Sequence, residues 1–185
     1  MSALVRLPQV LTFVESRAIC YYIASKYADQ GPKLLPDAAD IKGNAMFQQW
    51  ASVERDNWDK YAHPMIFEKI IKVSVKSSLA MFEIPDLGTD LTRLRNLHGS
   101  SPDLKVLKDN EVGFVPKLDV FENILSKQQY MGGNEFSLID IYYVPYTQKL
   151  FEAGYGHLIT DRSHINAWWE RVSGRKSWQE VLALP

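Results

Sequence analysis

FSLIDI, at residues 136–141, carries the clearest folding signal in the chain. Ser137 is a favoured helix N-cap, and Asp140 lies three positions later, where its carboxylate can accept a hydrogen bond from the backbone amide of the cap. Phe136 and Ile141 fit a hydrophobic staple around this capping box. We therefore predict a firmly fixed helix start inside an apolar core. We interpret Ser137 and Asp140 as structural, because capping boxes are far more often architecture than chemistry.

Helical patterns dominate the sequence on both sides of the capping box. From the box onward we predict three helices, over residues 138–152, 163–173 and 177–182, which glycines separate. Before it, the apolar spacing predicts a helix from residue 41 to residue 71, although Pro64 should kink or divide it.

The region between these helices has a weaker periodicity. Proline and glycine interrupt residues 83–116, which we predict to be mostly loop, with room for one helical fragment at residues 103–110. A clear helical pattern resumes over residues 117–127.

The start of the chain has a different composition. VLTFV, at residues 10–14, is β-branched and aromatic, which is typical of a buried strand, and it leads directly into a helical pattern over residues 17–27. Gly31 and Pro32 end this helix. We therefore predict a mainly α fold in which a strand and a helix precede a large all-helical part.

The composition excludes several classes of protein. With 185 residues, 46% of them hydrophobic, the chain can bury one large domain or one domain plus part of another. A net charge of −1 argues against nucleic-acid or anionic-membrane partners. Cys20 is the single cysteine and no Cys/His pair has ligand spacing, so we predict no disulfide and no metal site. Without a signal peptide or a spanning apolar run, we predict a soluble, cytoplasmic protein.

Glu15 and Ser16 combine a carboxylate and a hydroxyl at the end of the predicted strand, just before a helix. The Ser16 hydroxyl and the first helix amides can bind the carboxylate of an α-amino acid, while Glu15 can bind its ammonium group. An ordinary N-cap beside an exposed glutamate explains the same residues, and on spacing alone it is the better interpretation.

A second group of residues places aromatic and polar side chains on one helix face at spacings of three or four: Trp50, Glu54, Asn57, Trp58 and Tyr61. This face could line a ligand cleft. An amphipathic core helix with Glu54 at its border is the favoured interpretation.

The histidines and the tryptophan pair are not assigned to chemistry. None of the histidines stands in a metal-binding or triad-like order, and we give no catalytic role to His63, His98, His157 or His164. Trp168 and Trp169 predict a helix that packs one indole inward while the other covers the edge of the core.

Several segments resemble the cytosolic glutathione S-transferases. LTFVESRAI at residues 11–19 and YIASKY at residues 22–27 resemble the last strand and following helix of the family's thioredoxin-like domain. YMGGNEFSLIDI at residues 130–141 and INAWWERVSGRKSW at residues 165–178 resemble its helical domain. His63-Pro64, Pro145-Tyr146 and the Trp-rich final helices favour the phi class, including its fungal relatives.

The resemblance implies a function and a division of the chain. The implied activity is attack of the glutathione thiolate on hydrophobic electrophiles, with glutathione as co-substrate, no cofactor and a homodimeric assembly. Glu15 and Ser16 would bind the γ-glutamyl end of glutathione. Residues 1–34 would be a remnant of the thioredoxin-like glutathione-binding domain, and residues 38–185 the all-helical C-terminal domain.

The chain departs from the family pattern near its start. Family members carry a catalytic Ser, Tyr or Cys and a Val-Pro step before this strand; neither is recognisable here, and Pro8 lies too close to Glu15 to be that proline. The missing group stabilises the glutathione thiolate. We therefore assign no catalytic residue. Because the N-terminal segment is shortened, we expect the chain to conjugate glutathione only weakly.

Two alternatives remain open. The chain could be a noncatalytic binding or interaction module, like the transferase-like domains of translation elongation factor gamma subunits. It could also be a helical scaffold without a ligand, in which Glu15→Ala and Ser16→Ala would change only stability. No residue identifies the electrophile.

Overall fold

The computed structural model describes residues 15–72 and 101–184, and over these ranges the chain is built from helices and a single isolated bridge between Tyr130 and Gly133. This confirms the predicted mainly α class. The predicted strand at residues 10–14 lies outside the described residues. The elements are α1 (Ser16–Lys26), α2 (Ile41–Glu54), η1 (Arg55–Asp59), α3 (Lys60–Ile66), η2 (Phe67–Ile71), α6 (Leu104–Leu125), α7 (Leu138–Glu152), α8 (His157–Thr160), α9 (Ser163–Ser173) and α10 (Lys176–Leu182).

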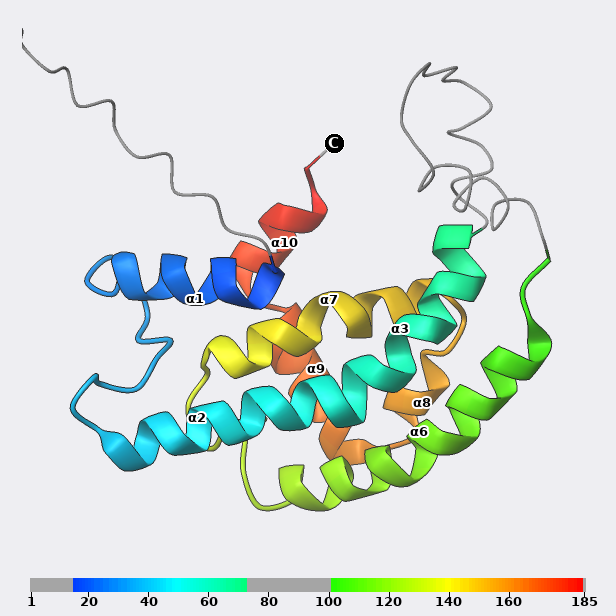
Figure 1. Cartoon of the computed structure of the whole chain (residues 1–185), viewed down its shortest axis with the longest axis horizontal. Helices are drawn as coiled ribbons and strands as arrows, with labels where there is room; N and C mark the ends of the chain where they lie inside the picture. Colours follow the sequence, from blue (N-terminus) through cyan, green and yellow to red (C-terminus); the bar gives the residue numbers. More distant parts are fainter. Residues whose placement is uncertain (1–14, 73–100, 185) are drawn as a thin grey trace, which may run out of the picture.

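The helices form a bundle around one core (Figure 1). The continuous helical run from α2 to η2 packs against α6 on one side and α7 on the other, while α9 contacts both α6 and α7. Helix α1 lies against α7 at the edge of this bundle. The predicted helices at residues 138–152 and 163–173 are confirmed as α7 and α9.

Of the two outcomes predicted for Pro64, a kink or a division, the helix that contains it is not divided. Pro64 lies inside α3, and the flanking turns η1 and η2 are π-helical, so the hydrogen-bond register changes on both sides of the missing proline amide. Ala62, Met65 and Ile66 are buried beside it. Tertiary packing therefore holds the chain helical where propensity alone would break it.

The prediction of loop up to residue 116 is wrong where the structure describes that region. One helix, α6, runs from Leu104 to Leu125 and contains Pro116. Asp103 caps its start by accepting hydrogen bonds from the next amides, and Phe114 and Leu118 on its inner face are fully buried. Burial of this apolar face outweighs the local effect of proline.

Gly113 has a packing role in the same helix. A Cβ added at this position would lie 2.6 Å from Cε1 of Tyr61. The glycine, which appeared to be a helix breaker in the sequence, therefore allows α6 to approach α3 closely.

An aromatic cluster centred on Trp58 fills the core. Its ring centroid lies 5.1–6.1 Å from four other rings in edge-on geometry, those of Phe114, Phe121, Tyr143 and Trp168. Trp168 is completely buried, and Trp169 stacks on Phe151 at the edge of the core. The predicted arrangement of the tryptophan pair is confirmed.

Ser137 and Asp140 form a capping box at the start of α7. The buried Asp140 carboxylate accepts hydrogen bonds from the Ser137 amide at 3.0 Å, the Met131 amide at 2.9 Å and Nε1 of Trp168 at 2.9 Å. The Leu138 amide donates to the carbonyl of Leu34 at 3.0 Å. One carboxylate thus joins the loop before α7, the start of α7 and helix α9.

We expect Asp140→Asn to destabilise the fold by about 1–3 kcal/mol, because an amide NH2 in place of Oδ2 would face the donating Ser137 amide. Asp140→Ala should cost more, since it leaves all three buried donors without an acceptor. Urea unfolding at pH 7 measures both. Asp109→Asn, which alters an exposed pair with Lys105, should stay within about 0.5 kcal/mol; an equally small loss for Asp140→Asn would contradict the assignment.

Candidate functional site

Glu15 and Ser16 lie at the N-terminal end of α1, and both side chains are exposed. The structure makes Glu15 the N-cap and Ser16 the first helical residue, and the Glu15 side chain makes no capping hydrogen bond. The first amides of α1 are therefore not satisfied by a side chain of the N-cap. A helix start of this kind has amide donors for an anionic group.

The backbone of Glu15 is strained. Its φ of 74° makes it the one non-glycine residue with positive φ in the described part of the chain. Such a conformation costs about 1–3 kcal/mol, and strained residues of this kind cluster at functional sites. This geometry, with Glu15 as the N-cap and Ser16 as the first helical residue, is not that of an ordinary Ser N-cap.

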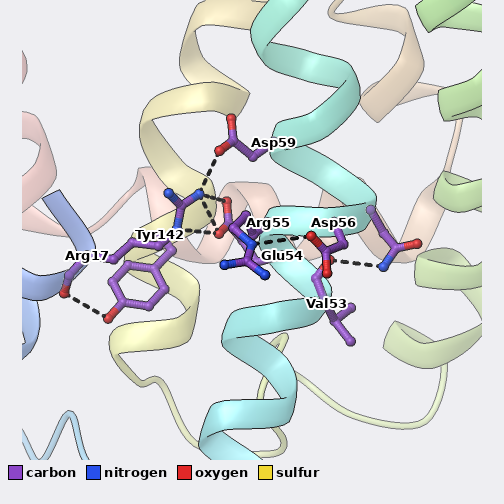
Figure 2. Close-up of polar contacts among 8 residues, drawn as sticks. Arg17, Val53, Glu54, Arg55, Asp56, Asp59 and Tyr142 are labelled. Atoms are coloured by element: carbon purple, nitrogen blue, oxygen red, sulfur yellow. Dashed lines mark hydrogen bonds and ion pairs between the residues drawn. The ribbon is translucent and has the colours of Figure 1, made fainter. Parts of the chain in front are cut away.

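Arg17 connects this corner to the helical bundle (Figure 2). Its guanidinium donates to both carboxylate oxygens of Glu54, at 2.8 and 2.9 Å, and to Oδ2 of Asp59 at 2.9 Å. Glu54 ends α2 and Asp59 ends η1. The residue directly after Ser16 is thus held by two carboxylates from another part of the fold.

Glu54 is completely buried, which corrects the prediction that it lies at the border of the core-facing side of its helix. Burial is tolerated because the bidentate pair with Arg17 compensates the charge. Desolvation nevertheless raises the pKa of Glu54 to about 7, against the opposing effect of Arg17. Burial alone would lower the pKa of Arg17, but Glu54 and Asp59 reverse this and raise it above its usual value.

Tyr142 completes the group from α7. Its hydroxyl donates to the carbonyl of Arg17 at 3.3 Å, and Cζ of Arg17 lies 5.9 Å from the centre of its ring. Burial raises the pKa of Tyr142 to about 12, so the hydroxyl keeps its proton at neutral pH. Helices α1, α2 and α7 and the turn η1 all meet at Arg17.

Sequence reasoning missed this group. The signal was a glutamate on an otherwise aromatic face, Glu54, together with an arginine directly after Ser16. An unpaired glutamate on such a face predicts a cationic partner, but the partner lies 37 residues away and spacing does not identify it.

The other residues of the predicted Trp50–Tyr61 face do not form one site. Trp58 is in the core, Asn57 donates to the carbonyl of Val53, and Tyr61 stacks on Phe114. Trp50 lines a cavity of about 410 Å³ between α2, residues 33–36 and residues 132–137, which neither Glu15 nor Ser16 lines. The core-helix interpretation is confirmed, apart from the position of Glu54.

Within the described residues there is neither a metal site nor a membrane-spanning helix. No group of His, Cys, Asp and Glu side chains within residues 15–72 and 101–184 is arranged to hold a metal ion. Among the helices described in those ranges, none is long and apolar enough to cross a bilayer.

The fold of the described chain is similar to that of solved glutathione transferases. The structure superposes on glutathione transferase F7 from Populus trichocarpa with a TM-score of 0.74 and 29% identity, over 95% of this chain and 71% of that one. It also matches the maize glutathione S-transferase I solved with an atrazine glutathione conjugate, with a TM-score of 0.72 and 27% identity, over 94% of this chain and 68% of that one. The bundle has the fold of the helical domain of glutathione transferases.

Sequence comparison identifies the family. Residues 96–176 match the family described as "Glutathione S-transferase, C-terminal domain". Glutathione S-transferase F10 of Arabidopsis thaliana is 35% identical over 170 residues, which cover 91% of this chain and 67% of the relative. Glutathione S-transferase F11 of the same plant is 31% identical over 175 residues, 94% of this chain and 70% of that one. The chain belongs to the glutathione S-transferase family, and these relatives are of the phi class.

Glu54 should make stability depend on pH. Its pKa rises from 4.5 to about 7 on folding, so between these values the native state binds more protons than the unfolded chain. Its contribution is complete below pH 4.5 and is lost as pH rises through about 7, with a slope of up to ~1.4 kcal/mol per pH unit. We expect Glu54→Gln to remove this part of the slope in urea unfolding between pH 5 and pH 8.

Glu152→Gln is the matched control, because Glu152 forms a partly exposed pair with Lys149. It should leave the slope of the wild-type chain unchanged. Identical pH dependence in the wild type and Glu54→Gln would show that Glu54 does not take up a proton on folding.

Proposed function

We propose that this chain binds glutathione at the Glu15–Ser16 corner and conjugates its thiolate to hydrophobic electrophiles. The observation that carries the proposal is the strained Glu15 directly before Ser16, at a helix start whose N-cap side chain leaves the first amides uncapped. Family membership supports the same conclusion. Solved relatives include a glutathione S-transferase-I with bound lactoylglutathione.

The corner matches the two charges of an α-amino acid. The Ser16 hydroxyl and the first amides of α1 donate to the γ-glutamyl carboxylate, and the helix dipole adds partial positive charge there. The Glu15 carboxylate accepts from the ammonium group. Because Arg17 is already paired with Glu54 and Asp59, its charge is largely compensated and it serves to place the corner.

The reaction joins the sulfur of glutathione to an electrophilic carbon. The thiolate electron pair forms the new S–C bond while a leaving group departs with its bonding pair, or while an activated double bond takes up the electrons and then a proton. The protein contributes by orienting the two reactants and by stabilising the thiolate. We assign no residue to thiolate stabilisation.

Other parts of the proposal concern organisation and location. Residues 1–34 belong to the glutathione-binding domain, residues 38–185 form the helical domain, and the protein acts as a cytoplasmic homodimer. The family resemblance supports these points.

Calorimetric titration with glutathione tests the proposal. We expect the wild-type chain to bind, and Ser16→Ala and Glu15→Gln each to weaken binding by about 10- to 100-fold. Ser16→Ala removes a hydrogen bond to the ligand carboxylate, and Glu15→Gln removes the negative charge that faces the ligand ammonium group. γ-Glutamylcysteine should bind and cysteinylglycine, which lacks the γ-glutamyl group, should not. Ser52→Ala, an exposed serine bonded to the carbonyl of Gln48, is the control and should bind like wild type.

Two outcomes would count against parts of the proposal. A folded wild-type chain that does not bind glutathione would contradict the site and the function together. Binding without conjugation of an aryl halide would retain the site and make the chain a noncatalytic glutathione-binding module.

A further inference from the structure

Helix α1 is weakly held by apolar packing. None of its residues is fully buried, and Cys20 and Ala24 are only partly buried against the core. Helix α1 has 11 residues, and helices of this length are only marginally stable in water when isolated. The position of its first turn therefore depends on the specific contacts made by that turn.

The contacts of the first turn with the bundle converge on Arg17. Its side chain pairs with Glu54 and Asp59, and its main-chain carbonyl accepts the hydrogen bond from Tyr142 (Figure 2). A carbonyl oxygen has two lone pairs, so it can accept from Tyr142 and still accept within the helix. The tyrosine is therefore not needed for α1 to be helical, but it fixes where the helix lies.

Tyr142 is itself rigidly placed. It lies in the first turns of α7, two residues after Asp140, and is 8% exposed. Its ring contacts that of Phe47 on α2, with centroids 6.4 Å apart. The Tyr142 side chain thus links the start of α7, which the capping box fixes, to the carbonyl of Arg17.

We propose that Tyr142 is a positioning residue for the glutathione corner: by holding the carbonyl and guanidinium of Arg17, it fixes the turn of α1 that carries Ser16. This inference rests on the proposed function, because the corner is the site that it positions. Tyr142 does not contact the ligand and acts through Arg17.

The neighbouring tyrosine provides a matched control. Tyr143 is completely buried in the aromatic cluster, and its hydroxyl has no hydrogen-bond partner among the described residues. Tyr142→Phe and Tyr143→Phe therefore remove the same atom from adjacent residues of one helix, and only the first change removes a contact with α1.

The test combines three measurements on each variant. We expect Tyr142→Phe to raise the dissociation constant for glutathione by about 2- to 10-fold, the effect of one lost hydrogen bond. Amide hydrogen exchange at residues 19–21, whose amides donate hydrogen bonds within α1, should be faster than in the wild type, without glutathione present. The midpoint of urea unfolding should change little. Tyr143→Phe should match the wild type in affinity and in exchange at α1.

The outcomes separate this inference from the proposed function. If the wild type fails to bind glutathione, the proposed function is overturned, and the positioning role falls with it. If the wild type binds and Ser16→Ala weakens binding, but Tyr142→Phe has wild-type affinity and exchange, only the positioning role is overturned. A lower urea midpoint with unchanged affinity would also overturn it, because it would show a purely structural role.

Discussion

The fold depends on one buried acceptor, the carboxylate of Asp140. It accepts hydrogen bonds from the loop before α7, from the N-cap of α7 and from Trp168 on α9, and it is completely buried. Desolvation raises the pKa of Asp140, and the hydrogen bonds from Trp168, Met131 and Ser137 oppose this effect. Because three segments meet at a single side chain, the start of α7 has one position relative to the aromatic core.

That fixed start has consequences beyond the core. Tyr142 follows Asp140 by two residues and reaches α1, while Leu138 donates to the carbonyl of Leu34 before α2. Helix α1 and the segment before α2 that contains Leu34 are therefore both hydrogen-bonded to residues of α7. Arg17 adds α2 and η1 to the same arrangement through Glu54 and Asp59. The candidate site is exposed, whereas the contacts that place it are partly buried.

The sequence predicted the parts of this structure that local chemistry specifies. The capping pattern at Ser137 and the glycine separators located α7 and α9 at their observed bounds. It failed where tertiary contacts override local preference: α6 continues through Gly113 and Pro116 because its apolar face is buried and because the glycine accommodates Tyr61. Glu15 and Ser16 were identified as a pair, but the Arg17–Glu54 contact joins residues 37 positions apart, which spacing does not reveal.

The network at Arg17 is better explained by orientation than by stability. A buried ion pair often contributes little net free energy, because desolvation offsets its Coulombic attraction, and the raised pKa of Glu54 shows that this cost is present here. Apolar contacts would hold α1 to the bundle with less desolvation, but they are non-directional and would let a short helix shift along its axis. A bidentate guanidinium pair, by contrast, has a fixed geometry. An arrangement that presents Glu15 in a strained conformation requires such directional contacts, since otherwise the turn would relax.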